Sequence, residues 1–137
     1  VGARDVGGTR PLPRRRAGGV AGKLRAVLEW GLAVGDRAEF LRKRAERGED
    51  TPTWTERPIL FDDLAHVWRA WLELHPTRQF VSLGMAGAAP QPLLFTELSN
   101  WMDLRGYTDP AEREELADML HELDVTFLGW AAKQRAQ

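Results

Sequence analysis

The stretch from Phe80 to Trp130 constrains the fold of this 137-residue chain more than any other part. A connector rich in Gly, Ala and Pro leads into a compact helix, LFTELSNWMDLRG, and the turn YTDPAE then opens a long amphipathic helix. Asp109 is a good helix cap, Pro110 suits the first helical position, and Glu112 would complete a capping box. This succession of connector, helix, turn and helix predicts helices at residues 97–105 and 110–134. We expect the segment to fold and to bind rather than to catalyse.

A third helix is predicted at residues 61–74, where apolar side chains recur at the spacing of one helical face. Pro76 ends it. The sequence carries no β-hairpin signal, so we expect an all-α fold, a small bundle of three principal helices. In the connector at residues 77–92, RQFVSLGM is left open, as either a short extended segment or a loosely packed turn, and GAAPQP is expected to be a loop.

The residue composition predicts how the rest of the chain is divided into segments. The first residues are rich in Gly, Pro and Arg and hold too few large apolar side chains to offset the entropy of ordering. A later stretch, EDTPTWTERP, holds two prolines and three threonines, which argue against any regular element there. The expected segments are a disordered basic arm at residues 1–22, a helical extension at 23–48, a linker at 49–58 and a helical domain at 59–137.

Charge is distributed unevenly along the chain. Residues 1–57 carry 13 basic and 8 acidic side chains, residues 58–137 carry 6 and 12, and the net charge is −1. A basic arm on an acidic body indicates an interaction tail, a docking segment or simply a solvated arm. The chain has no cysteine and no apolar run near the roughly 18 residues of a membrane span. These features fit a cytoplasmic protein.

Side chains that could catalyse are scattered. His66, His75 and His121 do not form the paired spacing of a zinc helix, and the connector lacks the ending of a phosphate-binding loop. Adjacent carboxylates sit at helix starts, where the helix dipole favours them. A helix-turn-helix is excluded because DPAEREELAD would repel phosphates. The sequence therefore predicts neither an enzyme, nor a cofactor, nor a metal site.

Asp124 borders the apolar face of the last helix, and a carboxylate in that position needs a partner. Arg78 and Arg105 are the candidate cations, and a structural salt bridge or a bond to a connector amide is favoured over catalysis. Tryptophans lie on the apolar faces of the three helices. Core packing is their default interpretation, but one of them could belong to an exposed partner-binding patch.

Residues 58–132 resemble a family of small tailed-bacteriophage proteins, the tail assembly chaperones or tail assembly proteins. The resemblance rests on the order of several motifs: LAHVWRAWLEL, PTRQF, GMAGAAPQP, LFTELSNWMDLRG, and an Asp-Pro start before LDVTFLGWA. None of these motifs is specific alone. The N-terminal part matches nothing in the family pattern, and the chain starts with Val1. Residues 1–57 are therefore natively translated, a frameshift extension or the result of a mis-called gene start, and the sequence does not choose among these.

The resemblance implies a non-catalytic helper in the host cytoplasm that binds a tape-measure or tail-tube protein through an aromatic apolar surface. A helix-in-groove contact is the expected mode. By position, the residues that would form this surface are Trp68, Trp71, Arg78, Gln79, Phe95, Trp101, Asp124 and Trp130.

Two other functions stay open. One is a small nucleic-acid-associated or regulatory protein that uses the basic arm, with weak contact through Arg14, Arg15 and Arg16. The other is a minor structural component of the tail.

Overall fold

A computed structural model describes residues 11–137, with side chains described from Gly22 onward. The described chain is mostly helical with one two-stranded sheet. Its α-helices are α1 (Pro11–Val34), α2 (Arg37–Glu46), α3 (Pro52–Thr55), α4 (Ala65–Leu74), α5 (Phe95–Leu104) and α6 (Pro110–Ala136). The strands are β2 (Phe80–Ser82) and β3 (Ala88–Pro90), and short 3-10 turns lie at Asp62–Leu64, His75–Thr77 and Gly84–Ala86.

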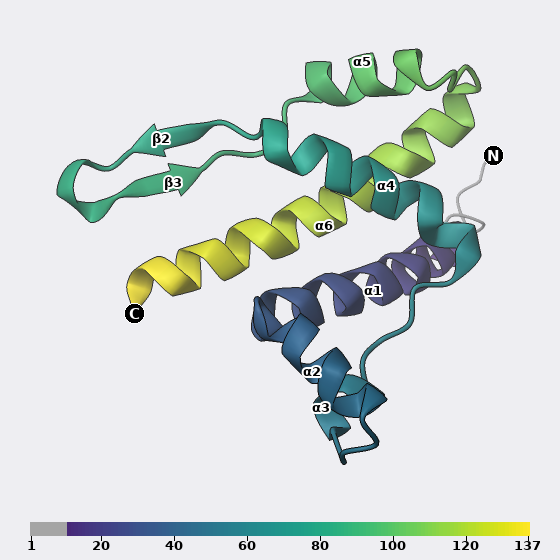
Figure 1. The fold of residues 1–137 in the computed structure, drawn as a ribbon. Helices are drawn as coiled ribbons and strands as arrows, with labels where there is room; N and C mark the ends of the chain where they lie inside the picture. Colours follow the sequence, from purple (N-terminus) through teal and green to yellow (C-terminus); the bar gives the residue numbers. More distant parts are fainter. Residues whose placement is uncertain (1–10) are drawn as a thin grey trace.

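Helix α6 is the central element of the fold. It runs through the middle of the molecule, with α1 along one side and α4 and α5 on the other (Figure 1). Each neighbour contributes side chains to one core, because the apolar stripe of α6 faces all of them. The largest fully buried side chains of this core are Leu24, Val67, Met102, Leu116, Leu120 and Leu123.

A carboxylate fastens α4 to α5 beside the core. Glu73 accepts a hydrogen bond from Trp101 Nε1 at 2.9 Å, another from Arg69 Nε at 2.9 Å, and one from Arg105. The Trp101 hydrogen bond, followed by those of the two arginines, lowers the pKa of Glu73 to about 2. Glu73 therefore stays ionised through the physiological pH range and holds the two helices together.

The prediction of a helical bundle is confirmed in its main point and corrected in detail. The three expected helices are present, but α5 begins at Phe95, two residues before the predicted start at residue 97. Asp109 does occupy the capping position of α6, with Pro110 first in the helix, although its side chain makes no capping hydrogen bond. Gly106 closes α5 at a φ of 82°, a conformation that glycine adopts without strain.

The all-α prediction is wrong in the connector, which contains an antiparallel β-hairpin. Phe80 pairs with Pro90, Val81 with Ala89 and Ser82 with Ala88. The tip bends through Gly84 at φ 66° and Gly87 at φ 96°. Strands of three residues are too short to display the alternation that reveals a strand, so the pattern missed them.

Two further differences concern the N-terminal part. The linker at 49–58 contains helix α3, because Pro52 occupies the first helical position, where a missing N–H costs nothing. Trp54 in this helix packs edge-on against Trp30 of α1, with ring centroids 6.0 Å apart. The first ten residues of the expected basic arm lie outside the described residues, and the backbone of α1 is already helical from Pro11.

Candidate partner-binding surface

The hairpin, defined here as residues 79–91, is the most exposed apolar part of the described chain. It extends away from the helices in the direction of the C-terminal half of α6 (Figure 1). Met85 at its tip is fully exposed, Phe80 is 60 % exposed, and Val81 and Leu83 are also exposed. No charged residue occurs between Arg78 and Glu97. Contiguous exposed apolar side chains of this kind mark interaction surfaces.

A buried ion pair anchors the base of the hairpin. Arg78 and Asp124 have side chains that are only 1 % and 8 % exposed, and Arg78 Nη1 lies 2.6 Å from Asp124 Oδ1. The same nitrogen donates to the Gln91 carbonyl at 2.8 Å, and the Leu93 N–H donates to Asp124 Oδ2 at 3.1 Å. Oδ1 itself receives no well-directed hydrogen bond from the described residues, so charge attraction holds it. The predicted salt bridge of Asp124 is confirmed with Arg78. The amide that Asp124 accepts from belongs to Leu93, one residue beyond the connector at residues 77–92.

Aromatic rings enclose this ion pair. The His75 ring stacks on Trp71 with centroids 4.9 Å apart and meets Phe127 edge-on at 4.5 Å. Arg78 Cζ lies 4.6 Å from the centre of the Phe127 ring. Arg78 is thus a cation held between a carboxylate and ring faces, which offsets part of its desolvation.

The protonation of His75 is set by this surrounding. Arg78 Nε donates to His75 Nδ1 at 3.3 Å, so the geometry assigns Nδ1 as the unprotonated nitrogen. Burial lowers the pKa of His75, the Arg78 cation lowers it further, and Asp124 opposes both. His75 is therefore held neutral at pH 7, where it accepts from the arginine that anchors the hairpin.

The eight residues predicted to form the binding surface separate into two groups. Trp71, Arg78, Trp101 and Asp124 are buried, so in this conformation they support the fold and cannot touch a partner directly. Trp68 and Trp130 are half-buried at the edge of the core, while Gln79 and Phe95 are exposed. The contact role of all eight remains a prediction, and only the second group has surface to offer.

Sequence reasoning overlooked the apolar side chains of the hairpin itself. Phe80, Val81, Leu83 and Met85 look like ordinary core candidates in a one-dimensional reading. The signal that marks them is the absence of any charge around them, together with the two glycines of the tip. An exposed segment that lacks charged residues and contains four large apolar side chains presents apolar surface to solvent.

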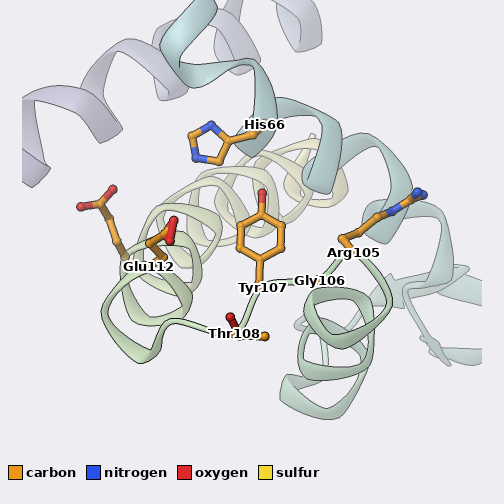
Figure 2. Close-up of a pocket in the computed structure, with 7 residues that line it drawn as sticks. His66, Arg105, Gly106, Tyr107, Thr108 and Glu112 are labelled. Atoms are coloured by element: carbon orange, nitrogen blue, oxygen red, sulfur yellow. The ribbon is translucent and has the colours of Figure 1, made fainter.

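Two cavities meet at Tyr107, which follows α5. The first, of about 610 Å³, is lined by His66 of α4, by Arg105 through Thr108, and by Glu112 and Glu115 of α6. Figure 2 shows the Tyr107 ring standing between these side chains, with its hydroxyl directed toward α4. Most of these side chains are polar. Among the described residues, no three His, Cys, Asp or Glu side chains gather closely enough to hold a metal ion.

The second cavity, of about 700 Å³, is a groove between α5 and the first half of α6. Phe95, Met102, Tyr107, Pro110 and Ala117 provide its apolar lining. Asp103, Arg113, Glu114 and Asp118 supply its charges, and Thr108 completes it. Phe95 is 72 % exposed at one end of this groove, so an aromatic side chain is available there for contact.

A protein-family model matches a large part of the chain. The family model for phage tail assembly chaperones matches residues 44–129, which is more than half of the chain. The chain belongs to the phage tail assembly chaperone family. The matched region runs from α2 into α6 and contains the hairpin, its buried base and the α5–α6 groove. No curated protein and no solved structure matches the chain.

Across residues 11–137, none of the helices combines the length and the apolarity that a bilayer crossing requires.

Proposed function

We propose that this chaperone is a non-catalytic helper of tail morphogenesis in the host cytoplasm, and that its hairpin binds a tape-measure or tail-tube protein before assembly. The observation that carries the proposal is the exposed, uncharged hairpin with Met85 at its tip. Burying each large apolar side chain of the hairpin against a partner would contribute about 1.5–3 kcal/mol. Membership of the phage tail assembly chaperone family supplies the class of partner.

The hairpin is also mounted in a way that suits binding. Its base is fixed through Arg78, Asp124 and the backbone of Gln91 and Leu93, so its direction is set before a partner arrives. A surface ordered in advance loses less conformational entropy on binding. The exposed Phe95 and the half-buried Trp130 offer further aromatic surface on the same body. We infer that the helices hold the hairpin in place and that the hairpin makes the main contact with the partner protein.

The test is co-expression of the chain with the tape-measure or tail-tube protein encoded beside it. The wild-type chain should keep the tail protein in the soluble fraction and co-purify with it. The double variant L83S/M85S should lose most of that activity while its circular dichroism spectrum stays unchanged. Val125→Ser, which removes an exposed apolar side chain from α6 instead, is the matched control and should behave as wild type. Full activity of L83S/M85S would refute the role of the hairpin.

A further inference from the structure

The groove between α5 and α6 joins an apolar floor to an acidic rim. The buried Met102 and the half-buried Ala117 belong to its apolar lining, Phe95 in the same lining is 72 % exposed, and the cavity measures about 700 Å³. That volume lies within the range of sites that take a large side chain or a small ligand. Glu114 and Asp118 are exposed on the α6 side. The groove therefore offers burial for one apolar side chain and negative charge for its neighbours.

The only cation of the groove lining is already engaged. Arg113 Nη1 lies 2.8 Å from Asp103 Oδ1 and donates to the Tyr107 carbonyl at 2.7 Å, while Nη2 donates to Ser99 Oγ at 3.2 Å. These bonds close the turn between α5 and α6 and neutralise Asp103. They leave the negative charge of Glu114 and Asp118 to face solvent.

Glu114 and Asp118 also repel each other. They are four residues apart on one helix, where like charges are neighbours and destabilise the helix. Neither forms an ion pair with any side chain of the described residues. A cation placed between them would relieve the repulsion and gain attraction from both carboxylates.

We propose that this groove is a docking site for a cationic amphipathic helix of the partner tail protein. One apolar side chain of that helix enters between Phe95 and Ala117, and Lys or Arg side chains one turn away lie against Glu114 and Asp118. Residues three or four apart on a helix share a face, so a single short helix presents both features together. The inference deepens the proposed function, because it names the chemistry of the segment that the chaperone would take.

The negative charge of Glu114 and Asp118 is the reason to expect a cationic helix in the groove. An acidic helix would face the carboxylates of the rim and be repelled, and an uncharged one would leave their mutual repulsion in place. The groove and the uncharged hairpin are therefore expected to differ in their response to salt. Added salt screens the groove contact and leaves the apolar hairpin contact almost unchanged.

The test uses the full chain and two synthetic peptides of about 15 residues, because shorter helices are marginal in water. One is a Leu/Lys amphipathic peptide, and the other carries Glu in place of every Lys. Fluorescence anisotropy of the labelled Lys peptide should show salt-sensitive binding, and the Glu peptide should not bind. In the variant E114K/D118K the affinity for the Lys peptide should fall by about tenfold or more.

The matched control is E29K/E56K, which changes the net charge by the same amount at exposed positions outside the groove. It should bind the Lys peptide within about twofold of wild type, because distant exposed charges are screened. Equal weakening by both double variants would mean that the peptide responds to the net charge of the whole chain and would overturn the groove. Wild-type affinity in E114K/D118K would overturn it as well.

The same measurements separate this inference from the proposed function. L83S/M85S should bind the Lys peptide as wild type does, because neither residue lines the groove and the hairpin points away from α5 and the start of α6 (Figure 1). A wild-type chain that solubilises the tail protein but does not bind the Lys peptide would overturn the groove alone. Peptide binding without solubilisation would overturn the proposed function alone.

Discussion

The base and the tip of the hairpin reverse the usual distribution of side chains in a protein. At the base, a charged pair is buried among aromatic rings, with Arg78 and Asp124 almost inaccessible to water. At the tip, the apolar side chain of Met85 is fully exposed and that of Leu83 is 43 % exposed. Each arrangement costs free energy when compared with its opposite. The base therefore fixes one position of the hairpin, and the tip keeps apolar surface available for contact with a partner.

Removing the carboxylate at the base should produce the largest effect. In Asp124→Ala the Arg78 guanidinium stays buried without a countercharge, and the Leu93 N–H loses its acceptor. We expect the free energy of unfolding to fall by about 3–5 kcal/mol, measured by urea denaturation.

Two companion variants show whether charge or shape is responsible. Asp124→Asn keeps the shape and an acceptor for the Leu93 N–H but removes the charge, so it should remain strongly destabilised. The double variant R78M/D124L replaces the pair with apolar side chains and should recover most of the loss. A loss below about 1 kcal/mol in Asp124→Ala would mean that water reaches the base and that the pair is not truly buried.

Truncating the apolar core should come next. Leu123 of α6 is fully buried, and Leu123→Ala is expected to lower the free energy of unfolding by about 2–5 kcal/mol through lost burial and a residual cavity. The measurement is again urea denaturation, with the exposed Val125→Ala on the same helix as control. A similar small loss in both variants would contradict the view of α6 as the central core helix.

Periodicity and helix-start chemistry predicted the helical body because both act within a few residues. The face of α4 and the Asp109-Pro110 start of α6 are local patterns, and they identify their helices whatever the tertiary context. The need of Asp124 for a partner could be predicted as well, because a carboxylate on an apolar stripe cannot be buried alone. Arg105, the other candidate, instead pairs with Glu73.

The hairpin could not be predicted in the same way. Its two strands are three residues long and depend on one another, on Gly84 and Gly87 at the tip, and on a base that lies far along the chain in α6. Nor could the sequence show which tryptophans are exposed. Trp71 and Trp101 occupy helical faces like that of Trp68, and only the packing of α4, α5 and α6 decides that the first two are buried.

Acidification should weaken the base by a smaller amount, through His75. The folded-state pKa of His75 is lowered by burial and by Arg78, so protonation favours the unfolded chain. The stabilising contribution is complete above the ordinary histidine pKa of about 6.5 and is lost as pH falls through that value toward the lower folded-state pKa. Urea midpoints measured between about pH 5 and 7.5 should rise with pH in the wild type. His75→Phe keeps a ring against Trp71 and Phe127 and should flatten that part of the profile.

The smallest effect on stability is expected at the tip of the hairpin. Leu83→Ser with Met85→Ser replaces one fully exposed and one 43 % exposed side chain, both outside the core cluster, so the free energy of unfolding should change by no more than about 0.5 kcal/mol. The double variant can even be slightly more stable than the wild type, because Leu83 and Met85 make no contact within the core cluster. The comparison of base and tip then becomes quantitative: the same hairpin would contain a site where one substitution removes several kcal/mol and a site where two remove almost nothing. A loss of about 2 kcal/mol or more at the tip would mean that Leu83 and Met85 are packed within the chain, and that the hairpin is a structural element of the body.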